Sequence, residues 1–130
     1  NKKIVEMKAT QSFLADFPKD AVVLCNFNHV QAVTACYLKD SNEIWLYGSN
    51  PEDLIAELLP RCRGLEDTTE LSQLVKERDV YFFGSFNSRE ELLKEWETEG
   101  IAYIEEGTYL LERYYFNVYH LVTNQSHVDP

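Results

Sequence analysis

The chain alternates short apolar runs with longer amphipathic segments. The runs AVVLCN, EIWLY and DVYFF at residues 21–26, 43–47 and 79–83 each end at a small or polar turn, and a segment with helical spacing of its apolar residues follows. This rhythm is typical of βαβ units, whose right-handed crossovers place the carboxyl ends of parallel strands on one edge of the sheet. Ligands bind outside that edge in open α/β sheets. The three turns are therefore the first place to look for a functional site.

The full pattern predicts an α/β fold. Strands are expected at 21–26, 43–47, 62–66 and 79–83, and the β-rich segments 101–104 and 109–122 are expected to form a hairpin across a Glu-Glu-Gly turn at 105–107. Helices are expected at 2–17, 29–38 and 51–60, after the cap Asp67, and from the capping box at Ser88 to Gly100. We expect a three-layer, Rossmann-like, mostly parallel sheet of five or six strands in the order 3-2-1-4-5, which allows an antiparallel C-terminal edge.

The chain is long enough for one domain with a substantial core. It has 130 residues, of which 45% are hydrophobic. Residues 1–17 are expected to form a leading helix that ends before Pro18, residues 18–125 a single α/β domain, and residues 126–130 a frayed tail.

Charge and hydropathy exclude some classes of partner. Lys and Arg total 12 against 22 Asp and Glu, which gives a formal net charge of −10. A nucleic-acid-binding protein needs clustered cations to neutralise phosphates, so no nucleic-acid partner is expected. No apolar run approaches the roughly 20 residues that cross a bilayer.

The cysteines do not indicate a redox or metal motif. Cys25, Cys36 and Cys62 have no CxxC spacing, and their odd number rules out a fully paired disulfide framework. Buried free thiols are the simplest interpretation, and one disulfide with one free thiol is the alternative.

Polar side chains follow the expected strands at the carboxyl edge. The candidates for ligand binding are Asn26, Asn28, His29, Ser49, Asn50 and Ser85. The turns that hold them, Gly-Ser-Asn and Gly-Ser before a helix, resemble backbone anion sites. The alternative is structural: Asn28 and Asn50 cap helices, His29 is exposed in a first helical turn, and glycines form ordinary tight turns.

Catalytic and cofactor motifs are not visible in the sequence. Ser49 and Ser85 lack the GxSxG context of an activated nucleophile, and no phosphate-binding glycine motif occurs. His29, His120 and His127 have no ligand-like spacing with the cysteines. We therefore expect no catalytic residue, no metal and no cofactor in this chain.

An aromatic-rich segment, ERYYFNVY at residues 112–119, is a second candidate surface. Arg113, Tyr115 and Tyr119 are the interaction candidates, because aromatic residues and arginine dominate protein interfaces. The alternative is a sheet strand that is covered on both faces.

Several of these residues occur in an order that resembles a known family. FPKDAVVL at 17–24 is followed by Asn28-His29, by ACYL at 35–38 and by an apolar strand. This layout is similar to the soluble C-terminal region of membrane-embedded glycosyltransferases that use polyprenyl-phosphate sugars and are dolichyl-phosphate-mannose-protein mannosyltransferase-like. In that family a last transmembrane helix leads to a Pro-x-Asp-Ala-Val-Val strand and then to a helix with an early histidine. The resemblance covers roughly residues 14–121.

The resemblance implies an extracytoplasmic domain at the cell membrane, attached to the transmembrane part of the same polypeptide and close to a lipid-linked sugar or its acceptor. Such enzymes hold their catalytic acid between early transmembrane helices, so only His29, Tyr37 and Leu38 match and no catalytic residue is carried over. The expected function is a non-catalytic accessory domain that positions substrate or partner. Two alternatives remain open: a free-standing enzyme domain that binds a nucleotide sugar or phosphorylated ligand, and an intracellular protein-interaction module.

Overall fold

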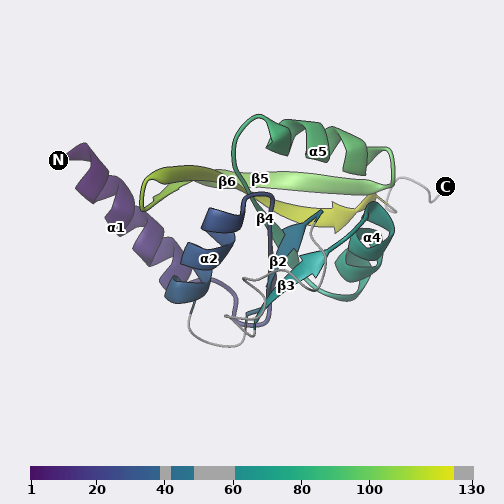
Figure 1. The fold of residues 1–130 in the computed structure, drawn as a ribbon, viewed down its shortest axis with the longest axis horizontal. Coiled ribbons are helices and arrows are strands. Elements are labelled where there is room, and N and C mark those ends of the chain that lie inside the picture. Colours follow the sequence, from purple (N-terminus) through teal and green to yellow (C-terminus); the bar gives the residue numbers. More distant parts are fainter. Residues whose placement is uncertain (39–41, 49–60, 125–130) are drawn as a thin grey trace.

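The computed structural model describes residues 1–38, 42–48 and 61–124. Within them the chain forms an α/β fold around one six-stranded mixed sheet (Figure 1). Its strands are β1 (Val22–Cys25), β2 (Ile44–Tyr47), β3 (Cys62–Leu65), β4 (Val80–Gly84), β5 (Ile101–Leu111) and β6 (Tyr114–Thr123). The helix expected at 51–60, its expected cap Asn50 and the tail at 126–130 lie outside the described residues.

The strand order across the sheet is β3-β2-β1-β4-β6-β5. The first four strands pair in parallel, so the expected order 3-2-1-4 is confirmed. The expectation that the fifth strand lies beside the fourth is wrong, because β6 pairs antiparallel with β4 on one side and with β5 on the other. β5 therefore runs parallel to β4 but forms the edge of the sheet, and β6 lies between them.

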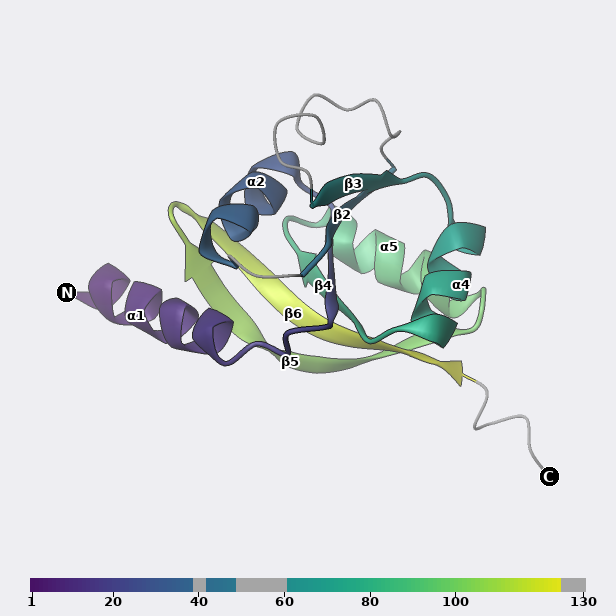
Figure 2. The ribbon, with the colours of Figure 1, turned by 90° about the horizontal axis from the view of Figure 1, so that it is seen from below.

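Helices cover both faces of the sheet. The described helices are α1 (Lys2–Ala15), α2 (Asn28–Tyr37), α4 (Thr68–Glu77) and α5 (Ser88–Glu97). Leu14 of α1 and Val30 of α2 belong to one buried cluster, whereas Leu71 of α4 and Trp96 of α5 belong to another. Successive residues of β1 alternate between the two clusters, as the twofold period of a strand requires. The described part of the chain thus has three layers, and Figures 1 and 2 show the amino end of α1 projecting beyond them.

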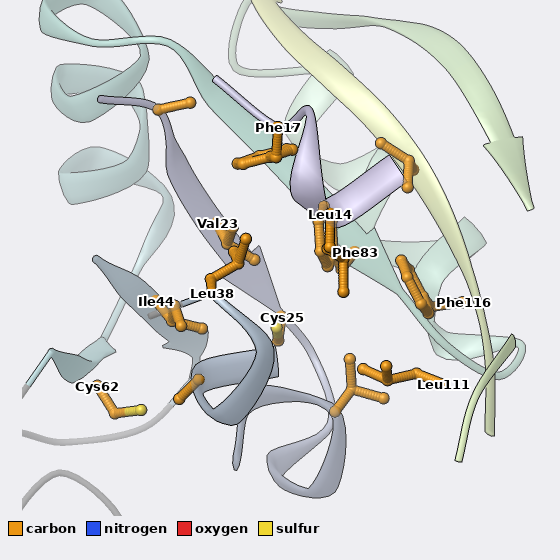
Figure 3. Close-up of a cluster of buried hydrophobic side chains, with 14 residues drawn as sticks. Leu14, Phe17, Val23, Cys25, Leu38, Ile44, Cys62, Phe83, Leu111 and Phe116 are labelled. Atoms are coloured by element: carbon orange, nitrogen blue, oxygen red, sulfur yellow. The ribbon is translucent and has the colours of Figure 1, made fainter. Parts of the chain in front are cut away.

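The core on the α1 and α2 side is rich in aromatic rings. Figure 3 shows Leu14 in the last turn of α1, and Phe17 just after the helix, lying over Phe83 of β4 and near Phe116 of β6. The rings of Phe83 and Phe116 stack at 4.8 Å, and Phe17 meets Phe83 edge to face at 5.6 Å. Burial of each such ring stabilises the fold by about 2–3 kcal/mol. α1 is therefore joined to the sheet through the core and not only by its chain connection.

The C-terminal hairpin turns at a different place from the one expected. The Glu-Glu-Gly segment is a β-bulge inside β5, where Glu106 is the extra residue between Glu105 and Gly107. The hairpin turn instead consists of Glu112 and Arg113, and Glu112 has a φ of 60°. A bulge bends a strand without ending it, which is why one strand extends across a segment that has the composition of a turn.

The helix-capping expectations have mixed outcomes. Asp67 does cap α4, because its carboxylate accepts a hydrogen bond from the Glu70 amide at 3.0 Å. The capping box at Ser88 is wrong: α5 begins at Ser88 with Asn87 in the cap position and no side-chain cap bond. The hydroxyl of Ser88 instead accepts a hydrogen bond from Asn26 at 2.8 Å.

Candidate functional site

The carboxyl ends of β1, β2 and β4 lie on one edge of the sheet, as expected from their parallel pairing. The β5–β6 hairpin turn reaches the same edge, because Gly84 at the end of β4 pairs with Asn117 near the start of β6. Ser49 and Asn50, two of the candidate ligand-binding residues, lie outside the described residues. The described part of the edge includes the turns after β1, β3 and β4 and the hairpin turn.

Asn26 and Ser85 join the turns after β1 and β4. The side-chain amide of Asn26 donates to the Ser85 carbonyl oxygen at 2.8 Å, and its oxygen accepts from the Ser85 amide at 2.8 Å. The same Asn26 nitrogen also donates to the Ser88 hydroxyl. This pair extends the β1–β4 ladder by a side chain, so it satisfies backbone groups that a strand end would otherwise leave unpaired.

The Ser85 hydroxyl is also used within the fold. Its side chain donates to the Tyr115 carbonyl oxygen at 3.1 Å, and the residue is 2% exposed. Gln31, in the second turn of α2, is equally buried and donates to the carbonyl oxygens of Ile44 and Arg63. The side chains of Ser85 and Gln31 therefore hydrogen-bond neighbouring strands and α2 to one another. Contacts with a ligand would come from other residues of this edge.

Asn28 and His29 are exposed at the start of α2. Asn28 is the first residue of the helix, and Phe27 occupies the cap position without a side-chain cap bond, so the structural alternative that Asn28 caps α2 is wrong. His29 stacks on Phe27 with ring centroids 5.0 Å apart and an interplanar angle of 19°. One face of the exposed imidazole therefore rests on an aromatic ring.

Four rings gather at this edge, and we call them the aromatic edge: Phe27, His29, Phe86 and Tyr114. Phe27 is the central ring, with Phe86 edge to face at 4.9 Å and Tyr114 edge to face at 5.0 Å. His29 and Tyr114 are 5.7 Å apart. Phe27 and His29 come from the turn after β1 and the start of α2, Phe86 comes from the turn after β4, and Tyr114 is the first residue of β6. Three segments far apart in the sequence therefore form one surface.

Phe86 has an unusual backbone conformation. Its φ is 62°, in the left-handed region, and its exposed fraction is 56%. A bulky residue is uncommon in that region, where glycine and asparagine are favoured, and the conformation costs about 1–2 kcal/mol. Such outliers cluster at functional sites. Phe86 thus combines backbone strain with an exposed aromatic surface.

The hairpin turn is attached to α2 beside the aromatic edge. The Tyr37 hydroxyl donates to the Glu112 carboxylate at 3.1 Å. Burial raises the pKa of Tyr37 above its ordinary value, and the bond to Glu112 raises it further. The hydroxyl therefore remains a neutral donor at physiological pH and holds the turn that carries Tyr114.

The three interaction candidates of the aromatic strand lie in different surroundings. Arg113 is exposed in the hairpin turn, and the exposed Tyr115 donates to the Glu6 carboxylate of α1 at 3.1 Å. That bond raises the pKa of Tyr115. Tyr119 is only 4% exposed and belongs to the core cluster under α5, where burial raises the pKa of its hydroxyl although the guanidinium of Arg89 lowers it. These candidates therefore do not form one continuous surface.

The described edge offers both apolar and polar groups to a ligand. No group of three or more His, Cys, Asp or Glu in the described ranges is arranged to hold a metal ion. The aromatic edge offers apolar ring faces together with an imidazole and a phenol, a combination that suits ligands with both flat apolar faces and polar groups. Sequence reasoning missed Phe27, Phe86 and Tyr114, and the available signal was an aromatic residue inside each of two polar turns.

Comparisons of the chain with family models, curated proteins and solved structures find no match. In the described ranges no helix has the length and apolar character needed to cross a membrane. Function is therefore inferred from the residues, their geometry and the resemblance described above.

Proposed function

We propose that this chain is a non-catalytic accessory domain of a membrane-embedded glycosyltransferase or cell-envelope protein, and that it positions a substrate or partner at the aromatic edge. The observation that carries the proposal is Phe86, whose side chain is 56% exposed on a left-handed backbone. A residue that costs backbone energy and buries little surface contributes little to folding. We therefore assign the Phe86 ring to contact with a substrate or partner outside the domain.

The aromatic edge suits a lipid-linked sugar or its acceptor as the positioned group. Aromatic rings bind flat apolar faces, and the imidazole of His29 and the phenol of Tyr114 supply hydrogen bonds at the rim of the surface. His29 is also one of the positions that match the polyprenyl-phosphate-sugar transferases. The parallel strands β3, β2, β1 and β4 supply the Rossmann-like part of the fold, at whose carboxyl edge a ligand is expected.

The amino-terminal part of α1 supports attachment to a membrane protein. Lys2, Lys3 and Lys8 concentrate positive charge there, although the chain as a whole has a net charge of −10. Ile4 and Val5 are 52% and 65% exposed, and Figures 1 and 2 show this part of the helix projecting from the sheet. Exposed apolar residues beside lysines suit the interface between lipid and water. The transmembrane part of the same polypeptide is the proposed neighbour.

The experiment uses the full-length gene product in its native membrane. Phe86→Asn removes the ring but keeps a residue that tolerates a positive φ, and Tyr103→Asn is the matched control because Tyr103 is 43% exposed on β5. We expect Phe86→Asn to weaken the use of lipid-linked sugar or acceptor about tenfold, equivalent to about 1.4 kcal/mol, at an unchanged protein level. The control should leave transfer unchanged.

Three outcomes would contradict the proposal. Unchanged transfer by the Phe86→Asn protein would show that the aromatic edge contacts no substrate. Turnover of a polyprenyl-phosphate sugar or nucleotide sugar by the isolated chain would favour the free-standing enzyme. A full-length protein without transmembrane helices that captures a partner through Tyr115 and Arg113 would favour the intracellular interaction module.

A further inference from the structure

A second concave surface lies between α1 and the sheet. This groove has a volume of about 570 Å³ and is lined by Ala9, Ser12, Phe13, Asp16, Phe17, Pro18, Tyr81, Glu106 and Tyr109. Its volume lies within the range of about 300–1,000 Å³ that is usual for small-molecule sites. None of the aromatic-edge residues lines it, so it is a separate site from the one proposed above.

Four aromatic rings form a continuous row along the groove. Tyr109 stacks on Phe13 with ring centroids 4.3 Å apart, Phe13 meets Phe17 edge to face at 5.7 Å, and Phe17 meets Tyr81 edge to face at 5.1 Å. The position of Tyr109 depends on Gly107, whose φ is 150° and where an added Cβ would lie 3.2 Å from the Tyr109 ring. The rings are therefore held in place by packing, which reduces the entropy cost of binding.

The β-bulge places a carboxylate beside these rings. Glu106 is the extra residue of the bulge and lines the groove, and Asp16 at the end of α1 lines it as well. The described lining residues include no Lys, Arg or His. Burial raises the pKa of Tyr81, and the charges of Glu106 and Asp79 raise it further.

We propose that the groove binds a small organic cation with a methylated ammonium group, of the choline type. The faces of aromatic rings carry negative quadrupole potential and attract such cations, and carboxylates within reach add Coulomb attraction. A methylated ammonium cannot donate hydrogen bonds from its nitrogen, so its binding depends on ring faces and on charge. A ligand that also carries a phosphate is disfavoured because Glu106 and Asp16 repel it.

The test is an amide chemical-shift titration of the chain with four probes: tetramethylammonium, choline, phosphocholine, and 3,3-dimethylbutanol, the uncharged isostere of choline. We expect saturable shifts at Phe13, Tyr81, Glu106 and Tyr109 with the first two probes. Choline should bind about tenfold more tightly than the uncharged isostere, because the isostere retains shape and apolar surface but lacks the charge. Phosphocholine should bind more weakly than choline.

Matched variants separate charge from ring chemistry. Glu106→Gln keeps the side-chain shape at an exposed bulge position and should weaken choline binding about three- to tenfold, while Glu99→Gln, at an exposed position outside the groove, should not. Tyr109→Leu keeps apolar bulk but removes the ring face, and it should weaken choline more than the isostere. Circular dichroism confirms that each variant is folded.

Several results would overturn the inference. One is the absence of groove shifts at choline concentrations up to roughly 50 mM, which corresponds to no useful affinity. Equal binding of choline and its uncharged isostere would be another, as would tighter binding of phosphocholine. An unchanged choline affinity in the folded Glu106→Gln protein would also contradict it.

Discussion

The side-chain amide of Asn26 makes two hydrogen bonds to the backbone of Ser85, one to its carbonyl oxygen and one from its N–H. These bonds continue the pairing of β1 and β4 beyond the ends of the two strands. The two hydrogen bonds, each 2.8 Å long, keep the two turns together at the carboxyl edge. Phe27 and Phe86 are the next residues along the chain, and their rings meet at 4.9 Å. The polar pair thus positions the aromatic edge, and it does so without presenting its own polar atoms to a ligand.

Removing this pair should destabilise the protein. Asn26→Ala leaves the part-buried backbone groups of Ser85 without partners, so the free energy of unfolding should fall by about 2–3 kcal/mol. Asn28→Ala is the control, because Asn28 is exposed and makes no cap bond, and it should change the stability by less than about 0.5 kcal/mol. Urea denaturation measures both, and equal losses for the two variants would show that the pair is not structural.

Trp96 should be the most sensitive position of α5. The ring is fully buried and meets Tyr47 and Phe82 edge to face at 5.2 Å and 4.8 Å. Trp96→Ala should cost about 3–5 kcal/mol through lost burial and a cavity. Trp96→Phe should cost less than half as much, because it keeps a ring and removes an indole N–H that has no partner among the described residues. A loss under about 1 kcal/mol for the alanine variant in chemical denaturation would contradict the observed packing.

The three thiols should differ in reactivity. Cys36 is exposed, whereas Cys25 and Cys62 are buried, and all three are free. Burial raises the pKa of the Cys62 thiol to about 11 and raises that of Cys25 still more, so neither forms a reactive thiolate in the folded state. A chromogenic disulfide reagent should label one thiol of the native protein rapidly and all three after unfolding. Rapid labelling that persists in the Cys36→Ser protein would be inconsistent with this arrangement.

The same raised pKa values predict how stability depends on pH. Above the ordinary thiol pKa of 9.0, the unfolded chain releases protons that the folded chain retains at Cys25 and Cys62. The contribution of the two thiols to the free energy of unfolding is therefore fully present below that pH. Above it the free energy of unfolding falls by about 1 kcal/mol per thiol for each pH unit. Tyr81 and Tyr119 have raised pKa values too and add to the loss at higher pH. Urea midpoints in reducing buffer across this range measure the effect, and a flat profile would refute it.

The parallel half of the fold could be predicted from the sequence because three of its four strands, β1, β2 and β4, are short apolar runs. All four residues of β1 are buried, and a short continuous apolar run that is bounded by turn residues is typical of a strand in a parallel sheet covered on both faces. The hairpin could not be predicted in detail. Glu105, Glu106 and Gly107 have the composition of a turn, and only the pairing of both halves of β5 with β6 shows that they form a bulge.

The candidate site was predictable in location but not in composition. Parallel strands bring Asn26 and Ser85 to one edge, yet their sequence positions do not reveal that they bind each other. The aromatic edge depends on long-range contacts between Phe27, Phe86 and Tyr114, which lie in separate segments. The left-handed backbone of Phe86 has no sequence signal, since phenylalanine rarely adopts it.

Amide chemical-shift mapping with a short-chain polyprenyl-phosphate sugar analogue tests the central proposal most directly. We expect the shifts to concentrate at residues 27–29, Phe86 and Tyr114, to disappear in the Phe86→Asn protein and to persist in the Tyr103→Asn protein. Phe86→Asn should itself change the free energy of unfolding by less than about 1 kcal/mol, because asparagine tolerates the left-handed conformation. Shifts confined to β6, with none at residues 27–29 or Phe86, or the same affinity in both variants, would contradict the account.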